Sequence, residues 1–238
     1  GFVLEVDDRT PPLLVPDGDR FRLEKFPLGT RVIYPVESLP RVADLTEAIG
    51  AALDAPIESA PLLARLQPSM KLTIAFDDIG TPTPKMQRPD IRGKVIEAVL
   101  TRAAKCGVDD VALVSANGLN RRMTADELQH IVGERVFRSF YADGLLTNHD
   151  AEDADRLTVV GSTAAGEIAL NARIAESDLL IFVHLVVAPS RHGAAAIAAG
   201  LGSTATIGQL SGMQAHGDEA TAAEIAALVS AAVPVFQI

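Results

Sequence analysis

Aromatic side chains and cysteine are scarce in this chain of 238 residues, which has two tyrosines, no tryptophan and one cysteine, Cys106. With aromatic residues at only 4%, the chain offers little as a stacking platform for bases or sugar rings. A single cysteine excludes a disulfide within this sequence and any multi-cysteine metal site, and it is typical of a reducing compartment. We therefore expect a cytoplasmic protein.

Positive charge and long apolar runs are also lacking. The formal net charge is -10, which argues against nucleic acid as a partner, because phosphate binding needs clustered lysine and arginine. The longest apolar run, residues 179–189, is interrupted by His184 and falls well short of the roughly 20 residues that cross a bilayer. No basic segment followed by an apolar run opens the sequence, so no secretory signal is visible. We expect neither a membrane span nor a nucleic-acid site.

The residues that are present can build a large core, since 48% of them are hydrophobic. Residues 1–37, rich in proline, glycine and charge, are expected to be an N-terminal extension with a short antiparallel strand pair near residues 20–23. Residues 38–238 are expected to form one α/β domain. Its first helix is predicted to begin near Pro40, because proline suits the first turn of a helix.

Strand and helix patterns then alternate through the domain, which is typical of a parallel sheet covered by helices. Strands are predicted at residues 71–76, 111–115, 157–160, 167–170 and 179–187. Helices are predicted at residues 91–106, 124–133, 193–199 and 220–233. Thr124 and Glu127 have the spacing of a capping box, which opens the second of these helices. The predicted fold class is therefore α/β, a Rossmann-like parallel or mixed sheet with helices on both faces.

Ligands of open parallel sheets bind beyond the carboxyl ends of the strands, so the residues after each strand are the candidates for a site. Asp77 and Asp78 follow the first predicted strand of the domain. Adjacent carboxylates in this place can bind a metal, a ribose or a substrate hydroxyl, or act as a base. The alternative is a turn in which the two side chains cap backbone amides.

Two further segments follow predicted strands. Gly118 and Arg121 lie in an amide-rich loop that can present N–H groups to an anion, although an ordinary strand-to-helix turn has a similar composition. His184 interrupts an apolar strand, where a lone histidine is more often a hydrogen-bonded core residue than a catalyst. Arg191 and His192 precede a predicted helix N-terminus, a combination that suits an anionic ligand. We expect these segments and the aspartate turn to converge on one cleft that binds a small anion.

His149 stands at the head of an acidic segment, residues 149–155, whose composition is similar to that of a metal site. The spacing of the acidic residues matches no calcium loop, so we expect a solvated acidic loop. No metal ligands are therefore assigned from the sequence.

Segments at these same places are similar to one protein family. They read FDDIGTPTP, RPDIRGKVIEAVL, SANGLNRRMTADEL, NHDAED and SDLLIFVHLVVAPSRHGAAAIAAGLGSTATI, in this order, within residues 68–211. Together they resemble the N-terminal domain of the nickel-dependent lactate racemase family. The resemblance implies a 2-hydroxy acid racemase or epimerase with a nickel-pincer nucleotide tethered to a lysine. It also implies one histidine on the nickel and others as acid and base.

The residues that the resemblance implies for this chemistry are largely replaced. Asn120 occupies the position of the family's first acid–base histidine, and an amide exchanges no proton near neutral pH. His184 lies within about one residue of the position of the second acid–base histidine. Ala195 occupies the position that the resemblance implies for the tethering lysine, and Ser211 that of the nickel-binding histidine. Thr81 occupies the position of an arginine that contacts the nucleotide. No cofactor is therefore predicted for this chain, and the nickel-pincer nucleotide is implied by the resemblance alone.

Two interpretations follow. In the first, the chain is a 2-hydroxy acid racemase or epimerase in which other residues, such as His192 or His216, replace the missing ligands. In the second, it is a catalytically degenerate relative that binds a small anion, of the 2-hydroxy acid or sugar acid class, or a partner. A second domain or a partner subunit would close the cleft in either case. Taken together, the residues and the resemblance give Asn120 and His184 as the candidate catalytic positions. The candidate cofactor-binding positions are Asp77, Asp78, Thr81, Gly118, Arg121, Arg191 and His192.

Overall fold

The computed structural model describes residues 1–18, 20–36, 40–81, 86, 88, 90–186, 193–216 and 219–238, with the backbone alone for 211–216 and 219. The chain divides into two compact units, residues 1–43 and residues 44–238. In the first unit, strand β1 (Val3–Glu5) pairs antiparallel with β4 (Arg31–Ile33), and β2 (Leu13–Asp17) pairs antiparallel with β3 (Arg20–Glu24). The strand pair predicted near residues 20–23 is therefore confirmed.

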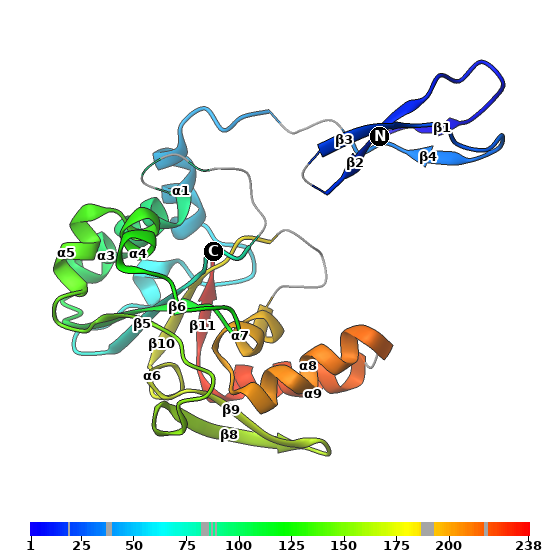
Figure 1. Cartoon of the computed structure of the whole chain (residues 1–238). Coiled ribbons are helices and arrows are strands. Elements are labelled where there is room, and N and C mark those ends of the chain that lie inside the picture. The colour runs from blue at the N-terminus through cyan, green and yellow to red at the C-terminus, as the bar shows by residue number, and fades with distance from the viewer. Residues whose placement is uncertain are drawn as a thin grey trace. The chain divides into compact units, whose positions relative to one another are not determined.

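A parallel sheet of five strands forms the centre of the second unit (Figure 1). Its order is β11 (Val235–Gln237), β10 (Leu179–Val183), β5 (Lys71–Asp77), β6 (Asp110–Ala116) and β7 (Leu146–Asn148). All four neighbouring pairs run parallel. Strand β10 is buried along its whole length, as expected of a central strand that is covered on both faces. The α/β fold class predicted from the sequence is confirmed.

Helices cover both faces of this sheet, and alternate side chains of each strand point to opposite layers. Leu72, Ile74 and Phe76 of β5 belong to one apolar cluster, and Ala75 belongs to the other. The first layer contains α1 (Leu45–Asp54), α2 (Leu62–Arg65), α3 (Ile91–Lys105), α4 (Ala125–Val132) and α5 (Glu134–Phe140). The second contains α6 (Ala172–Ala175), α7 (Gly193–Leu201), α8 (Thr204–His216) and α9 (Glu219–Ala232) (Figure 1).

Two predicted strands lie outside the parallel sheet. The segments predicted at 157–160 and 167–170 form β8 (Leu157–Thr163) and β9 (Gly166–Asn171), which pair with each other antiparallel in a separate two-stranded sheet. The two residues that join them are too few for the crossover that parallel strands require. A short 3-10 helix, η1 (Ala154–Arg156), precedes β8.

Two predicted boundaries were wrong, and one helix was missed. The first helix begins at Leu45 rather than near Pro40, because Asp44 caps it by accepting hydrogen bonds from Thr46 N and Glu47 N. The strand predicted at 179–187 ends at Val183, so His184 follows the strand instead of interrupting it. Helix α8, which begins at Thr204, was not predicted from the sequence.

The capping box of α4 is confirmed. Thr124 accepts a hydrogen bond from Glu127 N, and the Glu127 carboxylate accepts one from Thr124 N. Among the residues that the structure describes, no helix combines the length and the apolar character that a membrane span requires.

Candidate functional site at the carboxyl ends of the strands

Asp77 and His184 meet at the carboxyl ends of β5 and β10. The parallel register places Val183 beside Phe76, so the residues that follow these two are neighbours. His184 Nδ1 lies 2.9 Å from Asp77 Oδ2 and 3.0 Å from Oδ1. A carboxylate only accepts hydrogen bonds, so this contact places the ring proton on Nδ1. Both side chains are 10% exposed, and Leu185 N donates a second hydrogen bond to Asp77 Oδ2, at 2.6 Å.

A second pair lies beside the first, between β5 and the loop after β6. Asn120 Nδ2 donates a hydrogen bond to Asp78 Oδ2 at 2.9 Å, and Gly80 N donates one to Asp78 Oδ1 at 3.0 Å. Asp78 is buried, whereas Asn120 and Gly80 are exposed. A side chain at Gly80 would place its Cβ 2.6 Å from Asn120 Nδ2, so the turn at residues 78–80 closes tightly over the amide. Thr81 follows this turn and is half-buried.

A buried arginine ties the two aspartates to the next helix. The guanidinium of Arg92, in the first turn of α3, donates from Nη1 to the carbonyl oxygens of Asp77 at 2.6 Å and Asp78 at 2.7 Å. Its Nε and Nη2 donate to the two carboxylate oxygens of Asp90, the N-cap of α3, at 2.9 and 2.8 Å. The side chains of Arg92 and Asp90 are only 5% and 2% exposed. This ion pair was not predicted from the sequence, where an aspartate two residues before an arginine is the only signal.

Gly118 shapes the loop after β6. Its φ is +51°, and a Cβ at this position would lie 2.5 Å from the carbonyl oxygen of Ala199, at the end of α7. The Gly118 amide donates a hydrogen bond to Gly200 O at 2.9 Å. Glycine is therefore required here by the close approach of α7, and its N–H group binds within the chain.

Arg121, expected to face an anion, forms an exposed two-pronged ion pair with Glu127 in the first turn of α4. The distances are 2.8 Å from Nη1 to Oε2 and 2.6 Å from Nη2 to Oε1. The hydrogen bond from Arg121 is the main cause that lowers the pKa of Glu127 to about 2, and the same contact raises the pKa of Arg121. The structure thus directs this guanidinium to a carboxylate of its own chain.

His149 corrects the expectation of a fully solvated acidic loop. Its side chain is completely buried, with Nε2 2.8 Å from Gly202 O and Nδ1 3.2 Å from Asn171 Nδ2. Burial lowers the pKa of His149, which suits a neutral ring that donates from Nε2 and accepts at Nδ1. Asp150 forms an ion pair with the exposed Arg122. Among the described residues, no group of three or more histidine, cysteine, aspartate or glutamate side chains could hold a metal ion.

The remaining sequence-predicted positions are only partly covered by the structure. Arg191 and His192 lie outside the described residues, as do the side chains of Ser211 and His216. Ala195 is described and lies in the first turn of α7. Of the predicted site residues, the structure therefore brings Asp77, Asp78, Asn120 and His184 together, and it turns Arg121 toward Glu127.

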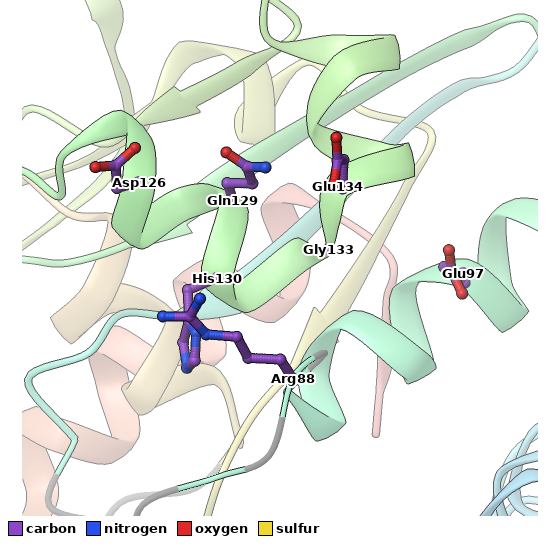
Figure 2. A pocket seen from close by; sticks show the side chains of 7 residues that line it. All are labelled: Arg88, Glu97, Asp126, Gln129, His130, Gly133 and Glu134. Atoms are coloured by element: carbon purple, nitrogen blue, oxygen red, sulfur yellow. The ribbon is translucent and has the colours of Figure 1, made fainter.

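A hollow of about 500 Å³ lies elsewhere, between α3 and α4 (Figure 2). Arg88, Glu97, Asp126, Gln129, His130, Gly133 and Glu134 line it. Figure 2 shows the side chain of Arg88 extending beside the ring of His130, whereas the carboxylates of Asp126, Glu134 and Glu97 are drawn apart from these two. Two of these carboxylates are already paired, Glu97 with Arg135 and Glu134 with Arg138. None of the four residues that meet at the strand ends lines this hollow.

A sequence model of the lactate racemase N-terminal domain matches residues 23–222. The chain belongs to this family. The solved structure of the lactate racemase apoprotein from Thermoanaerobacterium thermosaccharolyticum is similar, with a TM-score of 0.57 and 18% identity over 81% of this chain and 44% of that one. A protein of known structure from Thermotoga maritima is also similar, with a TM-score of 0.53 and 18% identity over 81% of this chain and 50% of that one. No curated protein matches the sequence.

These structural similarities support the fold, because 18% identity is too low to carry an activity. The chain spans about half the length of the two similar structures, or less. The family's nickel-pincer nucleotide can be tested against the residues present. At the position that the resemblance implies for the tethering lysine, Ala195 in α7 carries no amine. At the position that it implies for an acid–base histidine, the Asn120 amide donates to Asp78 and exchanges no proton. The described residues at these two positions do not fit this cofactor.

Proposed function

We propose that this lactate racemase-like domain binds a small 2-hydroxy acid or sugar acid at the carboxyl ends of β5, β6 and β10, without a covalently held nickel-pincer nucleotide. One observation carries the proposal: the Asp77–His184 and Asp78–Asn120 pairs meet at the edge where open parallel sheets bind their ligands. In both pairs the carboxylate is held within the chain, so the arrangement is formed before any ligand arrives.

The chemistry of these side chains suits a ligand that carries hydroxyl groups. Asp78 and the amide oxygen of Asn120 are acceptors, which complement the O–H donors of a hydroxy acid. The carboxylate of such a ligand needs a positive partner, and Arg191 and His192, which follow His184 in the sequence, are the groups that we propose for it. A second domain or a partner subunit would close the site, and the single cysteine supports a cytoplasmic location.

The binding test is a calorimetric titration with lactate, glycerate and gluconate, with glycerol as a neutral control and a mononucleotide as a second anion. We expect a hydroxy acid to bind and glycerol not to bind. Asp78→Asn should weaken binding, whereas Asp54→Asn, which alters an aspartate paired with Arg102 far from the strand ends, should not. Binding of glycerol alone, or equal binding by both variants, would contradict the proposal.

Racemisation or epimerisation of a 2-hydroxy acid is the second candidate, and the Asp77–His184 pair is the observation that favours it. A histidine oriented by a carboxylate through Nδ1 is an arrangement used for proton transfer at the other ring nitrogen. Asn120 supplies no second acid–base group, so we expect interconversion of the lactate enantiomers at the background rate only. Chiral analysis of lactate incubated with the protein separates the candidates, because an active enzyme would interconvert the two enantiomers in a His184-dependent manner.

A further inference from the structure

Arg92 is a buried arginine whose guanidinium is divided between one side chain and two backbone carbonyls. Two of its nitrogens bind the carboxylate of Asp90, and the third donates to the carbonyl oxygens of Asp77 and Asp78, at 2.6 and 2.7 Å. Asp90 is itself fixed as the N-cap of α3, because it accepts from Arg92 N at 2.9 Å. The first turn of α3 and the end of β5 are therefore joined by one rigid, planar group.

The two carbonyls belong to the residues whose side chains make the candidate site. The Asp77 carboxylate holds His184, and the Asp78 carboxylate holds Asn120. Because the peptide planes of a residue set the direction of its Cα–Cβ bond, a guanidinium that fixes both carbonyls also fixes where both carboxylates point. The side chains of Asp77 and Asp78 pair with His184 and Asn120. A shift of the backbone at the end of β5 would therefore disturb both pairs together.

We propose that Arg92, held by Asp90, is a positioning residue of the site: it sets the direction of the Asp77 and Asp78 carboxylates and thereby the ring tautomer of His184. The importance of this arrangement for ligand binding rests on the proposed function above, whereas the arrangement itself does not. Arg92 acts through the two aspartates and is not assigned a contact with the ligand.

The test compares Arg92→Lys and Asp90→Asn with a matched control on the same helix. Lysine keeps the charge but cannot bind a carboxylate and two carbonyls in one plane. Asparagine keeps the helix cap but cannot accept from Arg92 at both positions. The control is Arg102→Lys, because Arg102 makes a comparable ion pair with Asp54, at 3.0 Å, in the last turn of α3.

The primary readout is the 15N spectrum of the His184 ring, with the side-chain amide of Asn120 as a second probe. In the wild-type protein at alkaline pH we expect the proton on Nδ1, as the contact with Asp77 requires. Arg92→Lys and Asp90→Asn should shift the proton population toward Nε2 and move the Asn120 amide signals, whereas Arg102→Lys should change neither. Folded variants with unchanged His184 and Asn120 signals would overturn the inference. Loss of the fold in both variants would overturn it too, since Arg92 would then be required for folding rather than for positioning.

A titration with gluconate and lactate separates this inference from the proposed function. If the wild-type protein binds one of them, Arg92→Lys should weaken binding by about tenfold or more, as loss of a supporting residue usually does. If the wild-type protein binds neither, while His184 shifts only in Arg92→Lys and Asp90→Asn, the positioning role stands and the proposed function fails. If the wild-type protein binds and Arg92→Lys changes neither the affinity nor the 15N spectrum of the His184 ring, the proposed function stands and the positioning role fails.

Discussion

The replacement Gly118→Ala tests how closely the loop after β6 packs against α7. Gly118 has a φ of +51°, and an added Cβ would lie 2.5 Å from the carbonyl oxygen of Ala199. Gly144 offers a matched control, because its φ is +71° and no atom lies within 4 Å of the position of its Cβ. Both replacements force alanine into the left-handed region, at a cost of about 1–2 kcal/mol. Only Gly118→Ala also forces a backbone contact apart, which adds about 1–3 kcal/mol.

The two effects together predict that Gly118→Ala lowers the free energy of unfolding by about 2–5 kcal/mol, and Gly144→Ala by about 1–2 kcal/mol. Urea unfolding of both variants, followed by far-ultraviolet circular dichroism, measures the difference. Equal destabilisation by the two replacements would refute the argument, because it would show that α7 moves away from the loop without cost.

Three further predictions concern single side chains. Burial lowers the pKa of His149 below 6.5, so the unfolded chain binds this proton more readily than the folded chain does. The contribution of His149 to the free energy of unfolding should therefore be constant above about pH 6.5 and fall below it, by up to ~1.4 kcal/mol per pH unit. His149→Asn should reduce this slope in urea unfolding at several pH values, and an unchanged slope would contradict the assignment. The pKa of Glu127, about 2, should rise toward 4.5 in Arg121→Gln when followed by carboxyl 13C NMR, and a pKa that stays low would mean that the helix cap alone holds it down. Phe76→Ala, at a fully buried position, should cost about 3–5 kcal/mol of stability, whereas Phe21→Ala, at a side chain that is 68% exposed, should cost far less.

The central strands and their helices could be predicted because burial on both faces leaves a continuous apolar run in the sequence. Strands β5, β6 and β10 have such runs. The run of β10 continues in the sequence beyond Val183, where the strand ends, and its predicted end was therefore wrong. The edge strands β7 and β11 could not be predicted, since three residues are too few to show a period. The pairing of β8 with β9 was missed because alternation shows that a segment is a strand but does not name its neighbour.

The candidate site, like the fold, could be predicted from the sequence only in part. The meeting of Asp77 with His184 follows from a general rule, that residues after adjacent parallel strands share one edge. The Asp90–Arg92 pair does not, because the reach of a guanidinium back to the end of β5 depends on how the helix is placed. His149 was read as part of a solvated loop because its sequence neighbours are acidic, yet Gly202, 53 residues away, supplies the carbonyl that accepts from its ring. Local composition says nothing about such a distant partner.

This chain belongs to the lactate racemase N-terminal domain family, and we propose that it does not hold that family's cofactor. The decisive measurement is the intact mass of the protein after co-expression with the enzymes that make the nickel-pincer nucleotide, with nickel analysis of the same sample. We predict the mass of the unmodified chain and no stoichiometric nickel, because Ala195 offers no amine for the tether. A mass increase equal to the bound nucleotide, with one nickel per chain, would contradict the account.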